Sequence, residues 1–354
     1  MQRSLLLFEG AIKTEATRKH YLYYLRKFLE WAKIKDLDGL LQLKDSYLQQ
    51  MIEDYLFYQK KRVSPNSIVP RFAALELFFA MNDKPLNFKK IRKMFPGLVK
   101  KSGDNAWTTQ HIQKMLRHTK DNRNRSLILF ISSTGCRIGA IRDLKIKHLV
   151  EMPEGCKAVK FYEDSPEEYW SFLTPEASKS LDEYLNQRKN DGENLKLDSP
   201  LFRTKYKFGI TPAKPISNQA LNHIIRRIVL DSDLPRERKG QRFNIQQNHG
   251  FRKRFNTILK LNPNINPNIA EKLMGHKRGN DGTYLVPTRE ESFREFAKAI
   301  ADLTIDDNDR LRIENKKLQT ELSEKQRLED EIKRQGQSID FLLKKEKERE
   351  RRNS

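Results

Sequence analysis

The chain has 354 residues, of which 69 are Lys or Arg and 47 are Asp or Glu, so its formal net charge is +22. A positive charge of this size favours a polyanionic partner, and nucleic acid fits it better than a membrane surface. No apolar run approaches a membrane span, the N-terminus lacks a signal-peptide pattern, and there are only two cysteines. These features predict a cytoplasmic protein without a disulfide framework.

The first hundred residues show the periodicity of amphipathic helices and no strand pattern. Helices are expected over 14–34 and 45–58, and a third begins at the cap Ser64-Pro65-Asn66. A fourth helix, short and strongly basic, follows near residue 90. Residues 1–98 should therefore form a small helical domain. Its basic residues would face DNA phosphates; they are Lys60, Lys61, Arg62, Lys89, Lys90, Arg92 and Lys93. An ordinary solvated surface explains any one of these clusters equally well.

Residues 99–106 have the composition of a linker, and a second domain is expected over 107–304. Thr108 or Thr109 caps a first helix, and the apolar segment 124–133 is typical of a buried helix that presents Thr134-Gly135-Cys136-Arg137 at its exposed end. Two strands, 157–162 and 169–173, flank a turn at 164–167. Helices are then expected from Pro175, over 217–230 and over 289–303. The fold class is mainly α with a small β-sheet (α+β).

The last segment, 305–354, changes character. From Asp306 onward it has 14 basic and 13 acidic residues and is nearly neutral. Leu311, Leu318, Ile332 and Ile339 share one heptad position, and Leu322 and Leu343 share another, which favours a coiled coil. Lys325, Glu329 and Gly336 interrupt this seam, so a lone charged helix is the alternative.

Five side chains in the second domain suit chemistry on a phosphodiester. His249 and Arg252 are three residues apart, so a helix places them on one side. His276 follows a Leu-Met-Gly helix end, Tyr284 comes eight residues later, and Arg137 lies far upstream. Strand cleavage without a metal or other cofactor needs a nucleophile, cations, a base and an acid. No Asp/Glu cluster has metal-site spacing, which argues against a two-metal nuclease.

In this order the residues resemble the Arg…His-x-x-Arg…His…Tyr signature of the tyrosine recombinases, the phage-integrase family. The likeness covers roughly residues 14–303, and the N-terminal helices resemble the family's core-binding domain. It implies a site-specific recombinase or integrase that cuts and rejoins double-stranded DNA through a 3′-phosphotyrosine and works as a tetramer on synapsed DNA. By the same resemblance Tyr284 is the nucleophile, Arg137 and Arg252 hold the phosphate, His249 assists proton transfer, and His276 binds a phosphate oxygen.

The chain departs from the family pattern in three places. The hairpin tip, where the family carries a general-acid lysine, is the acidic run Glu163 to Glu168; Lys160 is the nearest candidate and Lys157 the next. Ala140 stands where a glutamate is common, and Tyr284 is one residue closer to His276 than usual. These differences indicate a divergent branch, such as an archaeal one.

Two other interpretations remain open. The acidic tip favours a non-catalytic DNA-binding protein of the same fold that regulates integration or excision. A type IB topoisomerase uses a similar catalytic set, although the N-terminal helical domain favours the recombinase. Taken singly, each residue also has an ordinary role: Arg137 in a surface ion pair, His276 as a helix cap, Tyr284 as one of 11 tyrosines.

Overall fold

The computed structural model describes residues 3–99, 105–204, 213–239, 242–276 and 284–353, with side chains described as far as Ile339. The chain divides into two compact units, Met1–Lys101 and Ser102–Ser354. Within the described ranges, no helix has both the length and the apolar character needed to cross a membrane.

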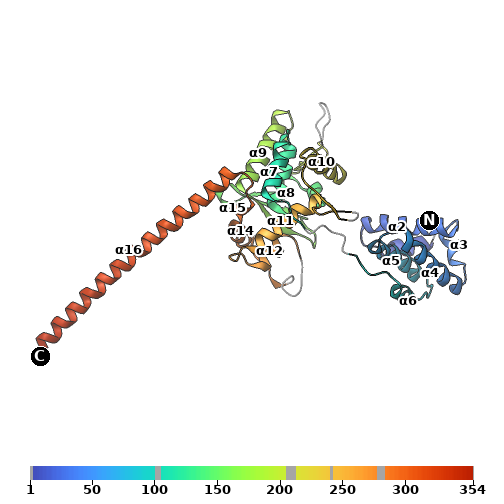
Figure 1. Cartoon of the computed structure of the whole chain (residues 1–354), viewed down its shortest axis with the longest axis horizontal. Helices are drawn as coiled ribbons and strands as arrows, with labels where there is room; N and C mark the ends of the chain where they lie inside the picture. Colours follow the sequence, from blue (N-terminus) through green and yellow to red (C-terminus); the bar gives the residue numbers. More distant parts are fainter. Residues whose placement is uncertain (1–2, 100–104, 205–212, 240–241, 277–283, 354) are drawn as a thin grey trace. The chain divides into compact units, whose positions relative to one another are not determined.

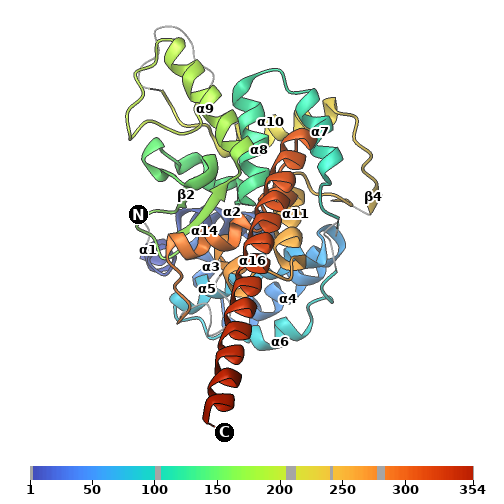
Figure 2. The same ribbon diagram turned by 90° about the vertical axis from the view of Figure 1, so that its left-hand side faces the viewer.

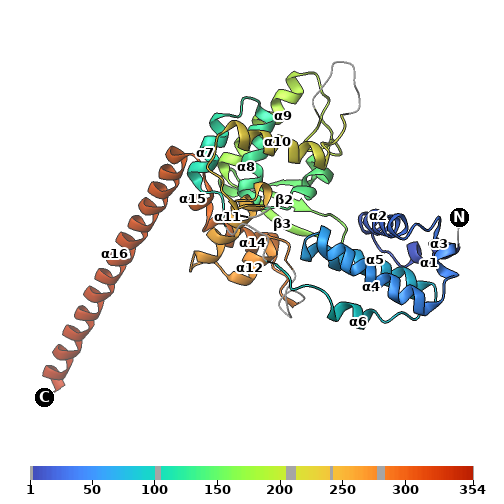
Figure 3. The same cartoon turned by 45° about the vertical axis from the view of Figure 1, so that its right-hand side comes forward.

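The first unit is helical throughout its described residues (Figure 3). Its core is largely aromatic, with Phe8, Phe28, Tyr55, Phe72 and Phe78 almost fully buried. The expected helices form, although α2 is slightly shorter than predicted and α4 continues to Arg62. Two short helices also form that periodicity could not reveal, because each is too short to repeat its pattern. The helices are α1 (Arg3–Gly10), α2 (Glu15–Ala32), α3 (Leu37–Leu41), α4 (Asp45–Arg62), α5 (Pro65–Met81) and α6 (Phe88–Lys93).

The second unit has a helical frame around a small sheet (Figure 1). Thr108 caps α7 in a reciprocal capping box with His111, and Asp121 caps α8 through the backbone N–H of Asn124. The helices are α7 (Thr109–Arg117), α8 (Asn122–Thr134), α9 (Pro175–Asn190), α10 (Asn218–Asp231), α11 (Gln247–Leu261), α12 (Pro267–Leu273), α14 (Arg289–Ala297), α15 (Ile300–Leu303) and α16 (Asp307–Asn353). Short 3-10 turns lie at Ile138–Asp143, Ile146–His148 and Pro153–Gly155.

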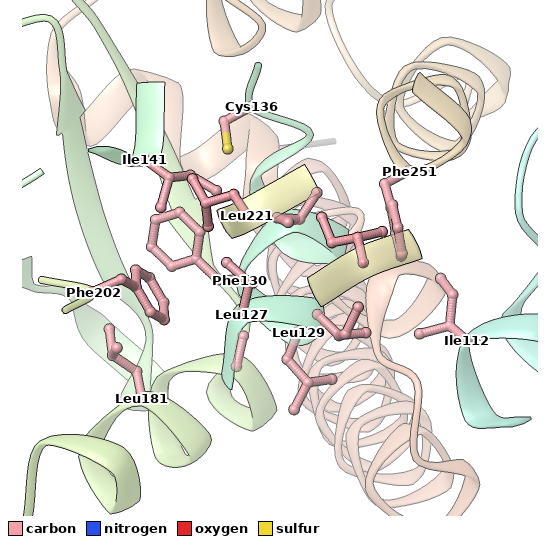
Figure 4. Close-up of a cluster of buried hydrophobic side chains, with 14 of the residues drawn as sticks. Ile112, Leu127, Leu129, Phe130, Cys136, Ile141, Leu181, Phe202, Leu221 and Phe251 are labelled. Atoms are coloured by element: carbon pink, nitrogen blue, oxygen red, sulfur yellow. The ribbon is translucent and has the colours of Figure 1, made fainter. Parts of the chain in front are cut away.

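The three-stranded sheet separates two cores. Its strands β1 (Leu149–Glu151), β2 (Lys157–Phe161) and β3 (Tyr169–Leu173) are antiparallel in sequence order. Val159 and Phe161 point into the larger core with α8 and α9, part of which Figure 4 shows around Phe130 and Phe202. Ala158 and Phe172 alternate to the other face and pack with Phe255 and Phe296. Helix α8 is buried from Ser126 to Thr134, as its apolar sequence predicts.

Two expectations need correction, and one element was not expected. The segment 289–303 is two helices, α14 and α15, which are separated at Lys298 and Ala299. The unexpected element is a short ladder of β4 (Arg238–Lys239) and β5 (Arg242–Phe243) before His249. The Thr134-to-Arg137 motif is not exposed as a whole, since Thr134 and Cys136 are buried and only Arg137 reaches solvent.

Helix α16 is one continuous 47-residue helix (Figures 1 and 2). Its first turns contact the rest of the unit, because Ile313 packs beside the core that contains Phe293 and Phe296. From Glu314 to Ile339 every residue is exposed. The tail is therefore helical, as the heptad pattern predicts, and its apolar seam is unpaired within the described chain.

Candidate active site

A glycine turn brings the two arginine motifs together. Helix α8 ends at Gly135, which has a left-handed backbone (φ +56°), and a Cβ there would lie 2.5 Å from the Phe255 ring of α11. Only glycine allows both the turn and this close approach. The turn buries Cys136 and sends Arg137 out to solvent. Burial raises the pKa of the Cys136 thiol to about 11, so this residue is a packing group and a poor nucleophile.

Arg252 lies at the centre of the cluster and is 8% exposed. Its Nη1 donates to the carbonyl oxygen of Gly135 at 2.7 Å, and its Nη2 donates to the carbonyl oxygen of Met274 at 2.7 Å. The same Nη2 lies 2.7 Å from Nε2 of His276. One guanidinium thus joins the ends of α8 and α12 to α11, and its orientation is fixed before any phosphate arrives.

His276 is held from both sides. Its Nδ1 lies 2.5 Å from a carboxylate oxygen of Glu271, which also forms an ion pair with Lys260. With Nδ1–H donating to Glu271 and Nε2 accepting from Arg252, the ring is the neutral tautomer. Burial lowers the pKa of His276 and the charges of Arg252 and Arg137 add to this, while the Glu271 carboxylate opposes them.

The loop that carries His276 also depends on a glycine. Gly275 has φ +64°, and a Cβ there would lie 2.5 Å from the ring of Tyr169 on β3. The sheet therefore packs directly against the start of this loop. Glu271 was not found from the sequence, because a glutamate within α12 carries no local sign that it will face an imidazole one turn later.

Arg137 and His249 face the same centre from more exposed positions. The charge of Arg137 contributes to lowering the pKa values of His249, His276 and Arg252, so the four groups share one electrostatic environment. Burial is the largest cause of the lowered pKa of His249. Neither the Arg137 guanidinium nor the His249 imidazole makes a hydrogen bond or ion pair with another described residue. Both remain available to a ligand.

Tyr284 is 83% exposed. Residues 277–283, which connect it to His276, lie outside the described residues, as do the loop positions that carry its unusual spacing. The structure therefore brings Arg137, His249, Arg252 and His276 together and leaves Tyr284 on the surface of the second unit.

The two candidate lysines on β2 differ sharply. Lys157 is almost buried, and its ammonium is held by ion pairs with Glu151 (2.5 Å) and Asp182 (3.2 Å). Lys160 lies on the opposite face of the strand, pairs with Glu168 at 3.3 Å, and has Nζ 5.8 Å from the centre of the Trp170 ring. Lys160 is the more accessible of the two, but acidic residues of the hairpin hold it.

The basic residues of the first unit are not equivalent. Lys90 and Arg92 form ion pairs with Glu53 and Glu76 of the neighbouring helices. Lys89 and Lys93 are exposed and have no ion pair to any residue in the described part of the chain. In α4, Lys60 and Arg62 lie over the rings of Phe57 and Tyr58, at 5.3 and 4.5 Å. Lys61 is exposed.

The buried Arg252 guanidinium is joined to the His276 imidazole, and Arg137 and His249 are exposed beside them, an arrangement that suits the binding of a phosphodiester. Comparison with known proteins makes this specific. Residues 108–281 match the model of the phage integrase family, a match that ends three residues before Tyr284. The tyrosine recombinase XerC of Treponema denticola is 25% identical over 296 residues, which cover 77% of this chain and 89% of the relative.

Solved structures agree on the fold. A XerH site-specific recombinase in a post-cleavage complex with a palindromic difH substrate has a TM-score of 0.54 at 20% identity, over 78% of each chain. A lambda integrase dimer bound to a COC′ core site has a TM-score of 0.52 at 15% identity, over 81% of this chain and 96% of the other. Residues 108–281 therefore form a domain of the phage integrase family, the tyrosine recombinases, and the chain has the mainly helical fold with a small antiparallel sheet of these solved structures.

Proposed function

We propose that this recombinase breaks and rejoins duplex DNA at specific sites, with Tyr284 as the nucleophile. The phenol oxygen attacks the scissile phosphorus, the bond from phosphorus to the 5′ oxygen breaks, and a 3′-phosphotyrosine and a 5′-hydroxyl result. The reverse attack by another 5′-hydroxyl rejoins strands. The observation that carries the proposal is the Arg252–His276 contact, which fixes the orientation of two side chains that the family signature assigns to the phosphate.

The phosphate would bind between a fixed and a movable cation. Arg252 is held by two backbone carbonyls, so the spare hydrogens of its guanidinium point in a set direction. Arg137 is exposed and free to close over the non-bridging oxygens. Donors that are oriented before the reaction stabilise the charge that develops in the transition state, which is where cleavage gains most of its rate.

Two further groups would move protons. His249 has a lowered pKa, so at neutral pH its imidazole is unprotonated and can accept the proton of the Tyr284 phenol. Lys160 is the group we assign to protonate the departing 5′ oxygen. For that, its ammonium must leave Glu168, and the DNA backbone would supply the competing negative charge.

Replacing the nucleophile tests the proposal. Tyr284→Phe should abolish covalent attachment to a nicked half-site and leave DNA binding nearly intact, because the basic surface supplies most of the affinity. Tyr162→Phe is the matched control, since Tyr162 also lies within the field of Arg137 and Arg252 and its pKa is raised mainly by burial. Loss of the adduct in Tyr162→Phe with its retention in Tyr284→Phe would assign the nucleophile to the hairpin.

The pairing of Lys160 with Glu168 is the one observation that favours a second function, a DNA-binding regulator of integration or excision with this fold. Such a protein would bind the site and form no adduct, even with activated substrates. For the recombinase we further propose that four protomers act together on synapsed double-stranded DNA in the cytoplasm, associated with the nucleoid.

A further inference from the structure

Helix α16 exposes a row of apolar side chains that nothing else in the described chain covers. Leu318, Leu322, Leu328, Ile332 and Ile339 are each 57 to 68% exposed. Two heptad positions contain most of this row. Leu318, Lys325, Ile332 and Ile339 share one, and the second, four residues later, contains Leu322, Glu329 and Gly336. These two positions form the seam of a two-stranded coiled coil.

The charges within the seam decide how two such helices can pair. In a parallel pair, identical residues meet, so Lys325 would face Lys325 and, in the next layer, Glu329 would face Glu329. Like charges in the core of a coiled coil oppose association. In an antiparallel pair, each layer joins a residue at one heptad position to a residue at the other heptad position of the second copy. Lys325 of each copy can then face Glu329 of the other, which gives two equivalent layers of opposite charge.

We propose that α16 pairs with α16 of a second copy of this chain as an antiparallel coiled coil whose two-fold axis passes beside Arg327. This register is set by the Lys325–Glu329 layers, and the neighbouring layers agree with it. Leu322 meets Ile332 of the second copy, and Leu318 meets Gly336, a large side chain over a small one. Leu328, beside the seam, meets Leu328 across the axis.

The register also accounts for the glycine. Gly336 is within a helix, where glycine is disfavoured, and a Cβ on it would touch nothing within 4 Å in the single chain. Opposite Leu318 of a second copy, the missing side chain provides room. One layer does not match, because Asn315 meets Ile339.

The geometry has a consequence for assembly. A two-fold contact of this kind closes with two copies and cannot extend into a fibre. The two Asp307 residues, where the helices begin, would lie about 40 residues apart along the pair, or about 60 Å at 1.5 Å per residue. A parallel pair would place them side by side. The proposal does not depend on the chemistry of the active site.

Disulfide trapping tests the register with the full-length protein. Asn315→Cys and Ile339→Cys versions are prepared, one of them with a size tag, and are mixed and oxidised under mild conditions. The antiparallel register predicts a cross-link between the two versions, and little self-cross-linking of Asn315→Cys, because its two copies lie about 36 Å apart in the pair. The Asn315–Ile339 layer suits this test because its two residues do not match, so replacing them with cysteine removes no favourable contact. The native Cys136 and Cys156 are buried and should not compete.

Thr320→Cys mixed with Arg334→Cys is the matched control. These positions lie at the same height in the proposed pair but point outward, so the mixed cross-link should be lost. Self-cross-linking of Asn315→Cys would instead establish a parallel pair. A mixed yield no greater than that of the outward control would show that the helices do not pair. Either result would overturn the proposal.

Discussion

The two arginines of the site differ in how the protein holds them, and this difference separates catalysis from folding. Arg137 is exposed and unpaired among the described residues, whereas Arg252 satisfies the buried carbonyls of Gly135 and Met274. Arg137→Ala should therefore slow cleavage without loss of stability. Arg252→Ala should slow cleavage and also destabilise the fold by about 1–3 kcal/mol, because buried acceptors lose their donor.

Single-turnover cleavage and urea unfolding of the same preparations measure the two effects. Each arginine should contribute about 2.7 to 4 kcal/mol to the cleavage barrier, as a preoriented oxyanion donor does. Arg142→Ala, an exposed arginine in the adjacent 3-10 turn, is the control and should change neither quantity. Normal cleavage by Arg137→Ala would remove that residue from the site.

The histidines give the reaction a defined response to pH. The pKa of His249 is lowered from 6.5 by burial and by nearby cations, so at neutral pH the free enzyme keeps this base mainly unprotonated. The second-order cleavage rate should be level near neutral pH and fall in more acidic solution, when His249 takes up a proton. A fall that begins above pH 7 would show that a different group is the base.

Among single residues, the sequence predicted that Arg137, Arg252 and the two histidines lie together, but not the contacts that orient them. The His-x-x-Arg spacing placed His249 and Arg252 on one side of α11, as helical geometry requires. Nothing in the sequence indicated that Arg252 would be anchored by the backbone of α8 and α12, or that Glu271 would fix the tautomer of His276. The two backbone contacts of Arg252 span 117 and 22 positions, and Glu271 reaches His276 across the end of α12, so only the folded chain brings these groups together.

Among the elements, the β2–β3 hairpin carries both candidate general acids, Lys157 and Lys160. If Lys160 protonates the leaving oxygen, Lys160→Ala should be slow on an ordinary substrate and should recover when the 5′ oxygen is replaced by a better leaving group. Lys157→Ala is the control: it breaks the ion pairs with Glu151 and Asp182, so it should lower stability and show no such recovery. Recovery by Lys157→Ala alone would reverse the assignment.

Element boundaries were predictable where a cap or a turn carried a signal. Thr108 and Ser64 marked the starts of α7 and α5, and the β2 and β3 strands formed on either side of the predicted turn. The break at Ala299 and the short β4–β5 ladder had no such signal. The break lies within the packing around Phe296, and the ladder is a pairing of Arg238 and Lys239 with Phe243 and Arg242. A local sequence pattern encodes neither.

For the whole molecule, the charge of +22 predicts a DNA affinity that falls steeply with salt. The individual cations should differ. Lys89→Ala and Lys93→Ala should each lower the slope of log affinity against log salt by about 0.9 if that residue contacts a phosphate. Lys90→Ala should lower it less, because Lys90 already pairs with Glu53. Equal effects for all three would mean that the pairs open on DNA.

The tail should matter for assembly rather than for chemistry. Ending the chain after Glu314 keeps Ile313 in its core and removes a helix whose described side chains, 315–339, are all exposed. The truncated protein should cleave half-sites at the normal rate, while synaptic complexes should require a higher protein concentration. Native gels across a concentration series measure this, and an unchanged dependence would show that α16 does not assist assembly.

The central claim is that Tyr284 becomes covalently linked to DNA. The wild-type protein is incubated with a nicked half-site, the trapped adduct is digested with a protease and a nuclease, and the modified peptide is sequenced by mass spectrometry. The account predicts a nucleotide on Tyr284, joined through its 3′ phosphate. A nucleotide on any other residue, or a bound half-site with no adduct at all, would contradict it.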